Sequence, residues 1–215
     1  MVIRTRPVVI AATAAMALGP AGCVSLKRTP EARFFVLRAL VEPPEAPVAA
    51  ARPGSFVGLL PVRVPGHLER PQLVTWAGPG ELRIDEYLRW AEPIDAGVAR
   101  TLAENLDALL PAHPVIRAPW AAAVTPFCRV RVDLRVFGPQ ESGEVRLEGR
   151  WMLLPGKGER PFVNRPTSLG RGPLPAGSGG VDAGAGVEAM SALLADLAKE
   201  IAAAVETLPA ETTEK

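Results

Sequence analysis

Residues 128–137, with the sequence CRVRVDLRVF, alternate between apolar and mostly charged side chains along the segment. Alternation with a period of two is typical of a β-strand that has one buried and one solvated face. Such a strand belongs in an antiparallel sheet that is covered on one side only. The side chains that we expect to face the core are those of Cys128, Val130, Val132, Leu134 and Val136.

Other segments also have the composition of strands. Residues 145–154 follow the turn PQESGE and are expected to pair with 128–137, while QLVTW and ELRI flank the turn residues AGPG and predict a hairpin. The remaining strands are expected at 34–37, at 55–64, at 162–169 and around Val115 and Ile116. Pro61 indicates that the strand in 55–64 ends, or lies on a sheet edge, at that residue. Short turns between consecutive strands indicate antiparallel pairing.

Two segments carry apolar residues at the spacing of an amphipathic helix. The first begins at Pro93, whose missing N–H suits a first helical turn, and ends before Pro111. The second runs from about Val187 to Leu208 and follows a glycine-rich segment, 170–186, that we expect to be a flexible loop. The order of these elements predicts an α+β fold, in which two amphipathic helices pack on one face of a mainly antiparallel sheet.

The N-terminal segment has the pattern of an export signal. Arg4 and Arg6 precede an uncharged run whose apolar part, about 11 residues, is shorter than the roughly 20 that a membrane-spanning helix needs. The small residues before Cys23 resemble the lipobox of bacterial lipoproteins, in which the cysteine is acylated and becomes the new N-terminus. The alternative is a secreted protein in which Cys23 is incidental.

This interpretation predicts the organisation of the chain. The segments are a lipoprotein signal peptide at 1–22, a tether at 23–33, a single domain at 34–210 and a frayed tail at 211–215. Acyl chains such as palmitate on Cys23 would hold the domain at a membrane, since two or more chains anchor a protein stably. Val24 and Ser25 stand where an aspartate would otherwise favour retention, and by resemblance to enteric lipoproteins this favours the outer membrane.

Charge and cysteine content exclude several classes of protein. The chain has 24 basic and 23 acidic side chains, and removal of the signal peptide takes away only Arg4 and Arg6. A nearly neutral domain has no electrostatic footprint for nucleic acid. With Cys23 lipidated, Cys128 has no partner for an intrachain disulfide, and we expect it to be a small buried side chain.

No constellation of residues in the sequence indicates catalysis. His67 and His113 are the only histidines, neither has a metal-ligand neighbour at helical spacing, and HExxH, CxxC and GxSxG motifs are missing. We therefore expect a protein that is not an enzyme and that holds neither a metal nor a cofactor. The arginines of residues 128–137 could bind phosphate, but a solvated strand face is the simpler explanation.

Two stretches go beyond such general patterns. One is VGLLPVRVPGHLERPQLVTW followed by ELRIDEYLRWAEPIDAGVARTLAENLDALL, and the other is VRLEGRWMLLPGKGERP with the terminal helix. Together they resemble the PqiC-type family, the auxiliary lipoproteins of ABC-type transport systems that carry MCE proteins. The matching positions are Pro61, Pro65, Leu68, Arg70, Pro71, Gln72, Trp90, Ala91, Glu92, Pro93, Leu102, Glu104, Asn105, Leu106 and Trp151.

The resemblance implies a non-enzymatic lipoprotein that is anchored in the outer membrane, faces the periplasm and supports membrane integrity. MCE proteins form hydrophobic conduits for lipids between the two membranes, and this protein would anchor or dock such a conduit, with several copies in a ring. The implied partners are an MCE protein and the outer membrane. The alternative is a free-standing periplasmic lipoprotein that binds a lipid itself, whereas an envelope hydrolase would need a nucleophile and base that the sequence does not show.

The loop from Pro65 to Gln72 is the expected site of partner contact, because arginine is enriched at interface hot spots. The candidate partner-binding residues are Leu68, Arg70, Pro71 and Gln72. The alternative for Arg70 is an internal ion pair. Trp90 and Trp151 are expected in the core rather than at a ligand.

Overall fold

The computed structural model describes residues 30–43, 55–121, 123–177 and 180–209. Backbone contacts divide the chain into Met1–Pro30 and a second compact unit, Glu31–Lys215, to which all of the helices and strands described below belong. The predicted signal peptide, Cys23 and the predicted tail lie outside the described residues, so lipidation stays a prediction.

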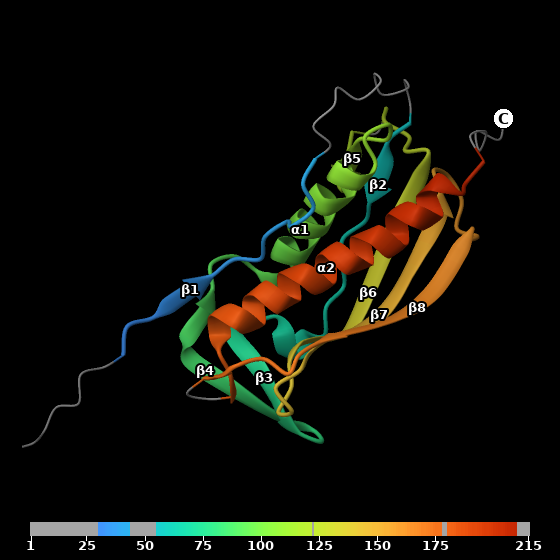
Figure 1. The fold of residues 1–215 in the computed structure, drawn as a ribbon. Helices are drawn as coiled ribbons and strands as arrows, with labels where there is room; N and C mark the ends of the chain where they lie inside the picture. Colours follow the sequence, from blue (N-terminus) through green and yellow to red (C-terminus); the bar gives the residue numbers. More distant parts are fainter. Residues whose placement is uncertain (1–29, 44–54, 122, 178–179, 210–215) are drawn as a thin grey trace, which may run out of the picture. The chain divides into compact units, whose positions relative to one another are not determined.

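The second unit combines two helices with two main sheets (Figure 1). The elements are β1 (Arg33–Phe35), β2 (Val57–Leu59), the 3-10 helix η1 (Gly66–Leu68), β3 (Gln72–Gly78), β4 (Glu81–Trp90), α1 (Ile94–Leu109), β5 (Val115–Arg117), β6 (Cys128–Pro139), β7 (Val145–Pro155), β8 (Val163–Arg171), β9 (Ala176–Gly177), β10 (Gly180–Val181) and α2 (Ala183–Glu206). The predicted hairpin is confirmed as β3 and β4, and the first helix ends before Pro111 as expected.

The larger sheet has the strand order β5-β2-β6-β7-β8, and α1 and α2 cover one of its faces (Figure 1). The α+β class and the placement of both helices on one face are therefore confirmed. The sheet is mixed, because β2 runs parallel to both β5 and β6, while β6, β7 and β8 are antiparallel. The chain builds a hairpin and a helix between β2 and β5, and a connection of that length permits parallel pairing.

A second sheet, with the order β1-β4-β3, was not expected from the sequence. Here β1 runs parallel to β4, and β3 and β4 form the antiparallel hairpin. The β4 strand continues to Trp90, well beyond the predicted ELRI, and its pairing with β3 is irregular where Asp85 accepts hydrogen bonds from the N–H groups of Tyr87 and Leu88 at 2.8 and 3.2 Å. The extra residues of β4 at this shift interrupt its alternation of apolar and polar side chains, so the sequence pattern covers only the first part of the strand.

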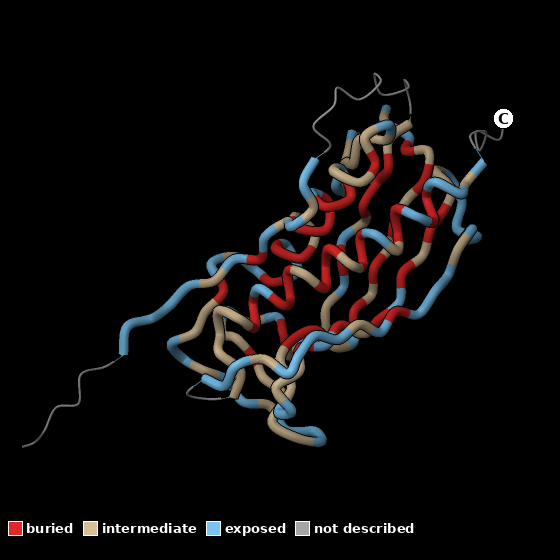
Figure 2. Tube along the Cα trace, viewed as in Figure 1, coloured by how far each residue is buried: buried red, intermediate tan, exposed pale blue. Residues whose placement is uncertain are grey.

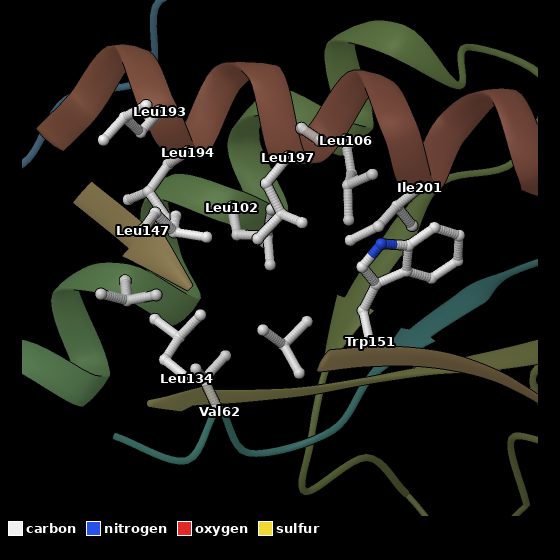
Figure 3. Packing of buried hydrophobic residues seen from close by; sticks show 14 of the residues in the cluster. Val62, Leu102, Leu106, Leu134, Leu147, Trp151, Leu193, Leu194, Leu197 and Ile201 are labelled. Atoms are coloured by element: carbon white, nitrogen blue, oxygen red, sulfur yellow. The ribbon is translucent and has the colours of Figure 1, made fainter. Parts of the chain in front are cut away.

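The main core lies between the two helices and the covered face of the larger sheet (Figure 2). Figure 3 shows Leu102 and Leu106 of α1, Leu197 and Ile201 of α2 and Trp151 of β7 pointing toward one another. All five side chains are at most 1% exposed. The apolar stripes of the two helices, read from the sequence, are therefore the stripes that pack on the sheet.

Strand β6 confirms the half-buried strand but corrects one of its residues. Cys128, Val130 and Val132 are fully buried, as expected, whereas Val136 is only half-buried and Phe137 takes its place in the core. The pairing with β7 shifts between Leu134 and Val136, which is a β-bulge. One extra residue in a strand reverses the side to which every later side chain points, so the expectation for Val136 was wrong.

Two predicted boundaries were also wrong. The expected strand at 55–64 is reduced to Val57–Leu59 and thus ends before Pro61, as the proline indicated. Pairing with β6 resumes at an isolated bridge from Arg63 to Asp133, because Pro61 has no N–H to donate. Helix α2 begins at Ala183 rather than Val187, since Asp182 caps it by accepting a hydrogen bond from the N–H of Ala185 at 3.0 Å. The glycine-rich segment before it contains the β9–β10 pair rather than only a loop.

Candidate partner-binding cleft

The loop from Pro65 to Gln72 is fixed by its own short helix and by the core. Leu68 is 7% exposed and belongs to the core, and its N–H donates to the carbonyl oxygen of Pro65 at 2.8 Å. The His67 ring meets the Trp76 ring edge-on, with centroids 5.3 Å apart. These contacts hold the following residues, Glu69 to Gln72, in a defined place beside the smaller sheet.

The loop meets the start of α1 through backbone pairing. The N–H of Trp90 donates to the carbonyl oxygen of Pro71 at 2.7 Å, and Gln72 is the register partner of Arg89. On the other side of β4, the N–H of Ala91 donates to the carbonyl oxygen of Phe35 at 3.0 Å. The two sequence motifs LERPQLV and WAEP, which are separate in the chain, are therefore neighbours in the fold.

A surface cleft of about 410 Å³ opens where these motifs meet. The lining residues are Glu69, Arg70, Pro71, Trp90, Ala91, Glu92, Pro93 and Ile94. Trp90 and Ile94 are buried and supply an apolar wall, while Pro71, Ala91 and Pro93 are exposed at the rim. An apolar wall with a few polar groups at its edge is the usual composition of a binding cleft.

Of the four predicted partner-binding residues, the structure brings two into the cleft. Arg70 and Pro71 line it, whereas Leu68 is buried in the core and Gln72 donates from Nε2 to Glu86 Oε2 at 3.1 Å. Sequence reasoning missed the contribution of Trp90 to Ile94, although WAEP was among the most specific matches of the resemblance. Trp90, at 9% exposed, and Trp151, at 1%, are core residues as expected.

Three charged residues, Glu69, Arg70 and Glu92, line the cleft, and Glu92 and Arg70 differ in how they are paired. Glu92 Oε1 accepts a hydrogen bond from Arg100 Nη2 at 2.6 Å, and this bond, assisted by Glu104, raises the pKa of Arg100 above its ordinary value although burial opposes it. Arg100 also donates to the carbonyl oxygen of Leu37 at 2.8 Å. Glu92 is thus held in place by α1 and is not free to bind a cation.

Arg70 makes no ion pair within the part of the chain that the structure describes, which leaves the internal ion pair without support. Its Nε is buried and has no hydrogen-bond partner among the described residues. The Arg70 side chain as a whole is half-buried and lines the cleft, so its charge can attract an acidic group of a ligand there. The cleft therefore combines an apolar wall with a cationic donor at its edge and suits an apolar segment that carries a carboxylate.

The arginines of β6 form ion pairs on the uncovered face of the larger sheet. Arg129 and Arg131 lie 3.4 and 3.6 Å from the carboxylate of Glu159, and Arg135 lies 3.7 Å from that of Glu148. The interpretation of this side as a solvated strand face agrees with the structure. Each of these arginines has a carboxylate partner within the protein, so none of them needs a phosphate as its counter-ion.

The remaining titratable candidates are spread through the fold. Cys128 is fully buried, and burial raises the pKa of its thiol to about 12. His113 contacts the carbonyl oxygen of Ser55 at 3.1 Å through Nδ1 and stacks on Phe127, while His67 lies near Trp76. Within the described ranges, no group of three or more His, Cys, Asp and Glu side chains is arranged to hold a metal ion.

None of the helices in the described part of the chain is both long and apolar enough to span a membrane. Comparison with protein families gives a match over residues 35–202 to the ABC-type transport auxiliary lipoprotein component. A comparison with curated proteins gave no match.

Solved structures of two proteins have a similar fold. One is an uncharacterized protein, with a TM-score of 0.59 and 20% sequence identity over 82% of this chain and 97% of that chain. The other is a Xanthomonas campestris protein of family DUF330, with a TM-score of 0.59 and 16% identity over 79% of this chain and 92% of that chain. At these identities the two structures support the fold alone.

Proposed function

The chain belongs to the family of ABC-type transport auxiliary lipoprotein components, and we propose that it docks the MCE conduit of such a transport system at the outer membrane. In this proposal acylated Cys23 anchors the protein in the membrane, and the domain faces the periplasm. The anchor raises the effective concentration of the domain for a conduit that reaches the same surface. A ring of copies would present the docking site to one conduit several times.

The observation that carries the proposal is the cleft between the LERPQLV loop and the WAEP helix start. It joins the two most specific motifs of the family resemblance, and it contains Arg70 without an ion pair among the described residues. Arginine beside a buried tryptophan is a frequent composition of an interface hot spot. The cleft suits an apolar segment of the MCE protein that ends in, or carries, an acidic group.

Charge reversal at Arg70 tests this role. We expect Arg70→Glu to weaken binding of the MCE protein by about 30-fold, which corresponds to the roughly 2 kcal/mol of an interface hot spot. Arg160→Glu is the matched control, because Arg160 is exposed in the turn after β7 and lies outside the cleft. Binding would be measured with the lipidated full chain in mild detergent against the MCE protein from the same envelope.

The outcomes separate the proposal from the alternative. If the Arg70→Glu variant bound the MCE protein as tightly as the Arg160→Glu variant did, with an unchanged melting temperature, docking through the cleft would be refuted. The protein could instead be recovered without an MCE protein, even after crosslinking, while mass spectrometry detects a bound lipid. That result would favour a free-standing lipid-binding lipoprotein.

A further inference from the structure

The smaller sheet exposes large apolar side chains on one face, which we call the Phe34 face. Its apolar members are Phe34, Ile84 and Tyr87, with exposed fractions of 63%, 37% and 39%. Exposed side chains of this size that gather on one face of a sheet indicate a contact surface rather than scattered surface residues.

Strand pairing puts these residues on the same side. Phe34 is the register partner of Arg89. Tyr87 lies in the irregular part of β4, where Asp85 and Leu88 line a cavity toward α2 whereas Tyr87 does not and is 39% exposed. Arg89 pairs in turn with Gln72, and Val74, two residues further along β3, pairs with Ile84. Paired residues, and residues two apart on a strand, point to the same face of a sheet.

The opposite face of the smaller sheet is occupied by the protein itself. Leu73, Thr75 and Leu88 of that side share a small cavity of about 80 Å³ with Val187 and Met190 of α2. The side chains that alternate with the Phe34 face are thus turned toward the start of α2. The Phe34 face points away from the helix, and its exposed part lies over β1 and β4, because on β3 Val74 is only 6% exposed and Trp76 is contacted by His67 of the loop from Pro65 to Gln72.

Basic side chains accompany the apolar ones. Arg38 is exposed four residues after Phe34, and the segment between Cys23 and β1 adds Lys27 and Arg28 in the sequence. Apolar and aromatic side chains together with arginine and lysine are the composition of surfaces that rest in the interface of a bilayer with anionic lipids.

The position of β1 in the chain indicates that a lipid bilayer covers the Phe34 face. Phe34 follows Cys23 by 11 residues, and a chain of that length spans at most about 40 Å. An acylated Cys23 would therefore keep the Phe34 face within that distance of the bilayer. A short linker raises the effective concentration of the second contact, so that a weak affinity of the face for lipid suffices to keep it occupied.

We infer that the Phe34 face lies on the surface of the lipid bilayer in which Cys23 is anchored, with Phe34, Ile84 and Tyr87 in the interfacial region. The inference rests on the lipid anchor of the proposed function and adds a second, non-covalent contact that orients the domain. The cleft at the end of β4 would then open close to the membrane surface.

Fluorescence quenching by spin-labelled lipids tests the inference. The full chain, processed in cells and purified from envelopes, carries Phe34→Cys, Tyr87→Cys or Phe162→Cys with an environment-sensitive fluorophore in vesicles of phosphatidylethanolamine and phosphatidylglycerol. Phe162, 39% exposed like Tyr87, is the matched control because it precedes β8 at the end of the larger sheet away from β3. Cys128 does not interfere, since it is fully buried and its thiol has a pKa of about 12.

We expect the labels at Phe34 and Tyr87 to be quenched at least about twice as strongly as the label at Phe162, and most by lipids labelled near the headgroup. Where Phe34→Cys lowers the melting temperature, Val36→Cys, 45% exposed in the wild type, takes its place. If the protein stays on the vesicles after a salt wash but all three labels are quenched equally, the inference is overturned. The proposed lipid anchor is then left intact. An unmodified Cys23, seen by mass spectrometry in a protein that washes off, overturns both.

Discussion

Gly149 is a residue at which a single methyl group should strongly lower stability. It lies in β7 opposite Leu134, directly beside the bulge of β6. A Cβ atom placed on Gly149 would overlap the carbonyl oxygen of Asp133 and approach Leu134 Cα to 3.0 Å. Both of these atoms belong to the backbone of β6, so no change of rotamer can relieve the overlap. A glycine within a strand marks such a close approach of two backbones.

The expected cost of Gly149→Ala follows from this geometry. Overpacking a filled core costs typically 1–3 kcal/mol, and we expect about 3 kcal/mol because the two strands would have to separate. For a domain of this size, each kcal/mol lowers the melting temperature by about 2–4 °C, which predicts a decrease of about 6–12 °C. Thermal unfolding followed by circular dichroism, with urea unfolding as a second measurement, gives both quantities.

Gly66→Ala is the matched control for the same chemical change. No atom lies within 4 Å of a Cβ placed on Gly66, which begins η1. Loss of glycine freedom in the unfolded chain should then stabilise the protein by about 0.4–1 kcal/mol. If Gly149→Ala and Gly66→Ala melted at the same temperature, the close approach of β6 and β7 at the bulge would be wrong.

Two further predictions concern α2. Asp182→Ala removes the N-cap bond to Ala185 and should lower the free energy of unfolding by about 1 kcal/mol in urea titrations, whereas Asp182→Asn should stay near the wild type; equal losses would contradict a capping role. Burial opposes the ionisation of Asp196, but hydrogen bonds from Lys199 and Arg171 outweigh it and lower its pKa. Because the folded-state pKa is lowered, ionised Asp196 stabilises the fold at pH values above the unfolded pKa of about 3.9, and this stabilisation is lost as the pH falls below that value. Asp196→Asn should therefore flatten the decrease in melting temperature between neutral and acidic pH. An unchanged pH profile of the melting temperature would refute this contribution.

The proposed docking cleft and the Phe34 face lie on the same small sheet. Trp90 at the end of β4 lines the cleft, and Tyr87, three residues earlier, belongs to the Phe34 face. A partner that binds the cleft would therefore be held near the bilayer without any further element. The larger sheet and its two helices supply the stability, while the smaller sheet carries both proposed contacts.

Local patterns in the sequence predicted the parts of the fold that depend on near neighbours. The β3–β4 hairpin, the pair of β6 and β7 and the helices α1 and α2 follow from alternation, helical spacing and turn residues. The errors arose where a single backbone or side-chain contact overrules the pattern, as at the bulge before Val136 and at the Asp182 cap. The bulge leaves no clear signal in the composition of β6, whereas Asp182 is a residue type preferred at N-caps and could have indicated the earlier start of α2.

The candidate site divides in the same way. The sequence alone indicated the export signal, the acylation of Cys23, which stays a prediction, and the motifs around Arg70 and Trp90, because these signals are read over a few consecutive residues. Only the tertiary structure decided that Pro71 pairs with Trp90, that Leu68 is part of the core, and that Phe34 and Ile84 share one exposed face. Pairing between distant strands depends on the closure of long loops and on the shared burial of apolar surface, which are properties of the whole chain rather than of any segment.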